Sequence, residues 1–198
     1  FPYFFVPVFF GLGAPTIILD TAFKVFRAGS VAYSAACDVV VPNQTRAYNN
    51  RDYDGMKRAI LAAALLSAIP TVTASLVLLT MGDALFAWLL GPAAVMPYVA
   101  PLLILLLFAN LIQMLSQSLL VHNGFFREIA LGGTILAIAM TLGTIIAAVA
   151  KVSLLQYLWI YAIIYSSGAL LFVALCWRGP IQVLRDAHAT KEMRPVIQ

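Results

Sequence analysis

The sequence predicts an all-α, polytopic membrane protein in which six transmembrane helices form one helical bundle. Of the 198 residues, 63% are hydrophobic and 10% are charged, whereas a soluble domain is about 45–50% apolar and about 25% charged. The mean hydropathy of the chain is +0.95. Mostly apolar stretches of about 20 residues, the length that crosses a bilayer, recur from one end of the chain to the other.

Six stretches are predicted to cross the membrane: residues 3–23, 28–45, 59–80, 96–121, 129–150 and 154–177. They define a transmembrane bundle over residues 1–178, which a polar tail at residues 179–198 follows. Prolines inside spans are tolerated because neighbouring groups satisfy the freed backbone. The chain begins at Phe1 within an apolar run that no charged segment precedes. We therefore interpret it as the later part of a longer protein and not as one that starts with a signal peptide.

Basic residues are distributed unevenly between the two sides that these spans define. Nine of the twelve are predicted on one side: Arg46, Arg51, Lys57, Arg58, Arg127, Arg178, Arg185, Lys191 and Arg194. The other side has only Lys24, Arg27 and Lys151. Because cytoplasmic loops are enriched in Lys and Arg, the first group is predicted to be cytoplasmic. With six spans, both ends of the chain are then cytoplasmic in a multi-pass protein of the cell membrane.

Charged residues lie in or beside the first two predicted spans, where charge is costly and indicates a functional site. Asp20 and Lys24 have the i, i+4 spacing of a helical ion pair. They either form a plain pair at the outer interface, or Lys24 and Arg27 place cations at the mouth of a cavity, where they meet an anionic group. Asp38, which lies near Tyr33, is either hydrated at the cytoplasmic mouth, or it lies within the membrane and titrates, pairs with another group or faces a water-filled cavity.

The fourth predicted span carries an amide stripe. Asn110, Gln113 and Gln117 fall within roughly 60° of one another on a helix that is otherwise rich in Leu and Ile. Amides that faced lipid would be unsatisfied, so the stripe is predicted to face other helices or water. It either joins helices by hydrogen bonds or lines a polar lumen.

Two other stripes are predicted to pack helices together. The sixth span has tyrosines one turn apart, at Tyr157, Tyr161 and Tyr165. The fifth span has a stripe of small residues that permits close approach of a neighbouring helix. Its members are Gly133, Ala137 and Thr141.

Sequence motifs of catalysis and cofactor binding are not evident. There is no P-loop, HExxH motif, nucleophile elbow or metal-ligand cluster. We therefore predict no enzymatic activity, catalytic residue, metal or cofactor, and no nucleic-acid partner. Cys37 and Cys176 lie in different spans without a nearby partner and are expected to be buried thiols.

Three segments carry a family resemblance. Asp20 is followed by AGSVAYSAACDVVVP at Ala28–Pro42, then by TRAYNNRDYDGMKRA at Thr45–Ala59, and later by LFAWLLGPA at Leu85–Ala93. In this order they resemble the polysaccharide flippases, which handle O-antigen and other lipid-linked oligosaccharides, of the multidrug/oligosaccharidyl-lipid/polysaccharide exporter superfamily. The layout resembles the family over the whole chain, and the motifs over some forty residues.

The resemblance implies a transporter of two six-helix bundles across a central cavity, with this chain as the C-terminal half. Its partners would be membrane lipids and the N-terminal bundle of the same transporter. The substrate would be an undecaprenyl-pyrophosphate-linked oligosaccharide, which crosses the inner membrane without ATP hydrolysis. The expected substrate-binding residues are Lys24, Arg27, Tyr33, Asn110, Gln113 and Gln117. Asp20 and Asp38 are the expected ion-coupling residues.

Two other functions stay open. A related drug or cation antiporter would use acidic lumen residues, which Asp20 and Asp38 would supply. A non-transporting membrane scaffold, as a subunit of a polysaccharide biosynthesis complex, would need neither Asp38 nor the amide stripe. Lys24 and Arg27 favour an anionic substrate over a cationic one.

Overall fold

The computed structural model describes residues 2–11, 13–90 and 99–192, and every regular element in these ranges is a helix. The elements are α1 (Pro2–Phe10), α2 (Ala14–Asn49), α3 (Tyr53–Leu90), α4 (Val99–His122), α5 (Phe126–Val149) and α6 (Leu154–Cys176). A π-helical segment at Trp177–Ile181 leads from α6 into α7 (Gln182–Glu192).

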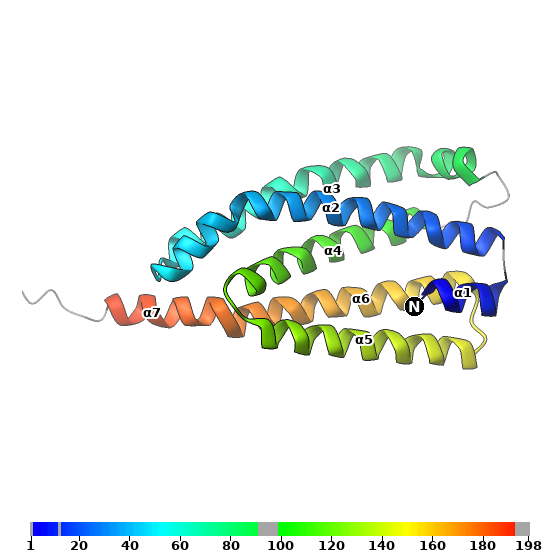
Figure 1. The fold of residues 1–198 in the computed structure, drawn as a ribbon. Coiled ribbons are helices and arrows are strands. Elements are labelled where there is room, and N and C mark those ends of the chain that lie inside the picture. Colours follow the sequence, from blue (N-terminus) through cyan, green and yellow to red (C-terminus); the bar gives the residue numbers. More distant parts are fainter. Residues whose placement is uncertain (1, 12, 91–98, 193–198) are drawn as a thin grey trace, which may run out of the picture.

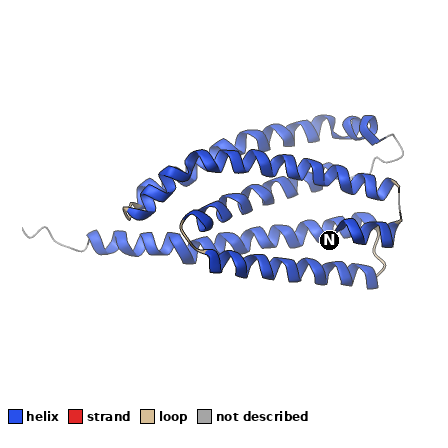
Figure 2. Ribbon diagram, viewed as in Figure 1, coloured by secondary structure: helices blue, strands red, loops and turns tan. Residues whose placement is uncertain are grey.

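The long helices run side by side as one elongated bundle (Figure 1). α2 and α3 pack as an antiparallel hairpin, α4 packs on α2, α3 and α6, and α5 packs on α6. The α2–α3 turn, the α4–α5 turn and α7 lie at one end of the bundle, and the α5–α6 turn lies at the other. Short turns join most of the helices (Figure 2), so the topology follows from chain order.

Four helical stretches of the described chain are long and apolar enough to cross a membrane: Tyr53–Trp88, Val99–His122, Phe126–Val149 and Leu154–Thr190. Large aliphatic side chains are exposed on the outside of the bundle, such as Ile138 and Ile146 on α5. Soluble monomers rarely expose contiguous apolar surface on this scale. The fold therefore indicates an all-helical membrane protein with lipid-facing sides.

The predicted boundary between the first two spans is wrong. A single 36-residue helix, α2, runs through residues 24–27, where spans at 3–23 and 28–45 require a turn. The break lies earlier, at Gly11 and Gly13, which have positive φ angles, and Pro15 stands in the first turn of α2. Lys and Arg are good helix formers, whereas glycine and proline mark helix ends. Charge within an apolar run is therefore a poor guide to the turn.

Six crossings are not seen in the part of the chain that the structure describes. α1 has nine residues, or about 14 Å of helix, against a hydrocarbon core of about 30 Å. α3 is longer than the predicted span 59–80. The start of the predicted span 96–121 lies outside the described residues, whereas spans 129–150 and 154–177 agree with α5 and α6 within a few residues.

Two apolar clusters hold the ends of the bundle. At one end, Phe5 and Leu19 pack with Leu102 and Tyr157. At the other end, Leu184 of α7 is fully buried in a cluster with Met56, Leu119 and Phe172. The predicted tail at 179–198 is therefore helical as far as Glu192, and its first turn is part of the packed bundle.

Candidate functional site

One face of α2 carries the charged residues that the sequence singled out. They are Asp20, Lys24, Arg27 and Asp38. Together with Ser34, which lies one turn before Asp38, they fall within an arc of about 80° on the helix, and we call these five residues the polar seam. Lys24, Arg27 and Asp38 are exposed on the bundle surface, as is Val31 between them. α2 is not among the helices apolar enough to cross a membrane unaided. The seam is thus a polar strip on an otherwise apolar bundle.

The Asp20–Lys24 pair predicted from the spacing is confirmed. The Lys24 Nζ and Asp20 Oδ2 atoms are 2.6 Å apart, with 75% of the lysine side chain and 40% of the aspartate side chain exposed. These two residues help to line a surface groove of about 380 Å³ on α2, together with Phe23, Phe26, Arg27 and Ser30. Its charges are one carboxylate and two cations, so the groove is net positive by one. It can attract a small anionic group.

Asp38 lies apart from this groove, further along the same seam. It is fourteen residues from Lys24, or about 21 Å along the helix. Its side chain is on the exposed face, whereas its neighbour Cys37 is buried. The structure thus brings Asp20, Lys24 and Arg27 together and leaves Asp38 as a separate exposed carboxylate.

Tyr33 points into the bundle and away from the seam. It is 1% exposed, and its hydroxyl group is hydrogen-bonded to Thr71 of α3 at 3.0 Å. The Thr71 hydroxyl also donates to the Ser67 carbonyl at 2.7 Å. Tyr33 therefore joins α2 to α3, and a substrate on the seam would not reach it in this conformation.

Asn110 joins three helices. Its Nδ2 donates to the Ser30 hydroxyl of α2 at 2.8 Å and to the Phe26 carbonyl at 3.4 Å. Its Oδ1 accepts a hydrogen bond from the Tyr165 hydroxyl of α6 at 3.2 Å. With 1% of its surface exposed, Asn110 has the helix-joining role that the sequence left open against a lumen-lining role.

The other two amides of the stripe are placed differently. Gln113 is 7% exposed, and its Oε1 is buried without a hydrogen-bond partner among the described residues. Gln117 is half-buried one turn further on. An unpartnered buried acceptor is costly. No hydrogen bond to Gln113 Oε1 among the described residues therefore explains why position 113 carries a polar side chain.

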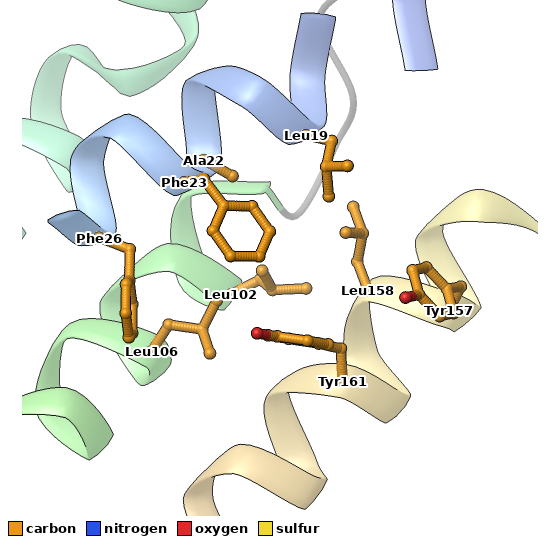
Figure 3. Close-up of a pocket in the computed structure, with 9 residues that line it drawn as sticks. All are labelled: Leu19, Ala22, Phe23, Phe26, Leu102, Leu106, Tyr157, Leu158 and Tyr161. Carbon is orange, nitrogen blue, oxygen red and sulfur yellow. The ribbon is translucent and has the colours of Figure 1, made fainter. Parts of the chain in front are cut away.

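An apolar pocket of about 20 Å³ lies between α2, α4 and α6 (Figure 3). Phe23 and Phe26 of α2 face Tyr161 of α6 across it, and leucines of α4 close one side. The volume is close to that of a single water molecule. This pocket is a packing defect, too small for a transported solute.

The tyrosine stripe of α6 does pack, as predicted. Tyr157 contacts the Phe5 ring with 4.9 Å between ring centroids, and Tyr165 meets Phe26 edge to face at 5.2 Å.

Sequence reasoning missed Ser30 and Thr71 as partners of the polar network. Hydroxyl residues are common in membrane helices, and only their position opposite Asn110 and Tyr33 distinguishes these two.

Both cysteines are buried and free, as expected. Among the described residues, no group of three or more His, Cys, Asp or Glu side chains is arranged to hold a metal ion. Comparisons with protein-family models, with curated proteins and with solved structures found no match. The polar seam and the Asn110 network are polar features of a largely apolar bundle.

Proposed function

We propose that this chain is one bundle of a membrane transporter that flips lipid-linked oligosaccharides, with the polar seam of α2 facing the transport path. The observation that supports the proposal is the exposure of Lys24, Arg27 and Asp38 on a helix that packs within an apolar bundle. Charged side chains in membrane segments face the protein interior or water and not lipid. A second bundle, facing the seam across a water-filled cavity, would give these charged side chains water and protein in place of lipid.

The charge of the groove favours an anionic substrate. Asp20 neutralises Lys24 through their ion pair, which leaves Arg27 in excess. Arginine binds phosphate oxygens in a planar, two-pronged arrangement, and such charge-assisted bonds are roughly twice as strong as neutral ones. A pyrophosphate-linked sugar lipid fits these requirements, and the family resemblance of the three motifs points to the same substrate class.

A cation antiporter is the second candidate, and Asp38 is the observation that favours it. Asp38 is an exposed carboxylate on the seam, and the ion pairs of the described residues join Asp20 to Lys24 and Asp54 to Lys57 instead. An antiporter would use Asp38 to bind its cation or proton. In a flippase, the same residue would couple an ion gradient to the movement of the substrate.

The test is a repeat-unit export assay with the full-length transporter at normal expression. The Lys24→Ala, Arg27→Ala double variant should lower export about tenfold or more, because two charge-assisted contacts are lost. Arg27→Lys should have a smaller effect than Arg27→Ala. Lys151→Ala, which removes an exposed cation from the α5–α6 turn, is the matched control. Normal export by the double variant would reject the role of the groove.

A drug or cation uptake assay separates the two candidates. Asp38→Asn keeps the side-chain shape and removes the charge. If Asp38→Asn abolishes export of a cationic compound while oligosaccharide export stays normal in every seam variant, the antiporter is the correct assignment.

A further inference from the structure

A second groove lies at the opposite end of α2, between α2 and α3. It has a volume of about 440 Å³. Its walls include Asn43 and Arg46 from the end of α2, Asn50 from the turn that follows, and Arg58, Ala59 and Ala62 from the start of α3. It lies at the α2–α3 end of the bundle, where the sequence predicts the cytoplasmic side (Figure 1). Neither the polar seam nor the Asn110 network includes these residues.

Two arginines, one from each helix, supply the positive charge of this groove. Arg46 and Arg58 are exposed, and within residues 2–11, 13–90 and 99–192 neither side chain forms an ion pair. The carboxylate in the groove belongs to Asp52, whose Oδ1 accepts a hydrogen bond from the Gly55 N–H at 2.8 Å. That bond caps the first turn of α3. With two cations and one carboxylate, the groove is net positive by one.

An aliphatic stripe on α3 continues from this groove along the bundle. Leu65, Ile69 and Leu76 lie within about 40° of Arg58 around the helix, and they are 59%, 67% and 56% exposed. Ile69 is eleven residues beyond Arg58, or about 16 Å, which is about half of the 30 Å hydrocarbon core. The groove and the stripe therefore match a phospholipid. The cationic groove fits the anionic headgroup, and the aliphatic stripe fits an acyl chain.

We infer that the α2–α3 groove binds the phosphate of an anionic phospholipid. Arg46 and Arg58 bind the phosphate oxygens from the two helices, and the Asn43 and Asn50 amides lie beside them. The acyl chain lies along Leu65 and Ile69. The bound lipid bridges the two helices at the end of their hairpin. Basic pockets between transmembrane helices bind anionic headgroups in this manner, and the inference is independent of any transport activity.

The experiment measures lipid retention and does not require transport. The purified chain in neutral detergent is mixed with equal amounts of phosphatidylglycerol and phosphatidylcholine, and the retained lipids are counted by native mass spectrometry. The wild-type chain should retain phosphatidylglycerol preferentially. Arg46→Gln and Arg58→Gln should each lower that preference about fivefold, and the double variant should abolish it. Because both side chains are exposed and outside the ion pairs of the described residues, these changes should leave the fold intact.

Two controls test whether retention depends on this groove and on the acyl chain. Arg127→Gln removes an exposed cation at the same end of the bundle, on α5 and outside the groove, and it should keep the preference. Inorganic phosphate in large excess should not displace the lipid, because it lacks the acyl chain. An equal loss with Arg127→Gln, full retention by the double variant, or displacement by phosphate would each overturn the assignment.

Discussion

The Tyr165 hydroxyl donates a hydrogen bond to Asn110 Oδ1 across 3.2 Å, which links α6 to α4 in the middle of an apolar bundle. The amide group of Asn110 then donates to Ser30, so the link extends to α2. Beside this network, the contact between these three helices is made by aliphatic and aromatic side chains, so the network is what holds them in one register. Polar pairs of this kind fix how helices align, because apolar contacts alone distinguish poorly between one alignment and another.

Replacing Asn110 with Leu should destabilise the bundle by about 1–2 kcal/mol. The substitution leaves the Tyr165 and Ser30 hydroxyl groups without their interhelical partner, and interhelical hydrogen bonds in membranes contribute about 0.6 to about 1.7 kcal/mol each. The free energy of unfolding is measured by denaturant titration in micelles. Tyr165→Phe should show about half of the loss.

Gln113→Leu is the matched control on the same helix. Because Gln113 Oε1 is buried without a partner among the described residues, a leucine removes an unsatisfied acceptor and should leave the stability unchanged or raise it by up to about 1 kcal/mol. A loss as large as that of Asn110→Leu would show that Gln113 has a polar partner in the membrane.

Adjacent glycines of α5 should respond oppositely to the same substitution. A Cβ atom at Gly132 would lie 2.9 Å from Phe172 Cε1 and 3.0 Å from Leu175 Cδ1 of α6, whereas a Cβ at Gly133 would meet nothing within 4 Å. Gly132→Leu should therefore destabilise the α5–α6 contact by about 1–3 kcal/mol through overpacking. Gly133→Leu should be neutral or slightly stabilising, since leucine has the higher helix propensity.

The same denaturant titration compares the two variants. Equal stability of Gly132→Leu and Gly133→Leu would mean that α5 is rotated so that Gly132 no longer faces α6. Gly168 of α6 provides an independent check, because a Cβ there would approach Leu136 Cδ1 to 2.6 Å.

The helix α5 also shows why part of the packing could not be predicted from the sequence. The predicted close-approach stripe contains Gly133 and Ala137, but both are exposed, and Gly132 and Gly143 face α6 instead. The centres of the two stripes differ by about 130° around the helix. Beyond the two charged residues of its first turn, α5 has no amide or charge to mark its inner face, so hydropathy alone could not choose between the two stripes.

Where polar residues mark a face, the sequence is more informative. The Asp20–Lys24 spacing predicts their ion pair, and the amide stripe predicts an inward face for Asn110. The same charges mislead the assignment of spans, because they indicate a turn where α2 is continuous. Tyr33 lies near the seam in sequence, yet its side chain points to Thr71 on α3. The burial of Tyr33 depends on how α2 packs against α3, which the residue pattern of α2 alone does not predict.

The sidedness of the bundle can be tested by cysteine labelling in intact cells. Eight of the nine basic residues predicted to be cytoplasmic lie at the end that holds the α2–α3 turn and α7, since Arg194 is outside the described residues. Asn49→Cys places a thiol there, and Lys151→Cys places one at the other end; both positions are exposed. Cys37 and Cys176 are 2% and 4% exposed, so the native thiols should give little background.

An impermeant maleimide added outside should label Lys151→Cys and leave Asn49→Cys unlabelled until the cells are opened. This outcome follows because a surplus of Lys and Arg keeps a short loop in the cytoplasm. The reverse pattern would invert the bundle and put the α2–α3 groove in the outer leaflet. Labelling of both positions from outside would contradict a membrane-spanning bundle, because the two turns lie at opposite ends of helices that are long enough to cross the bilayer.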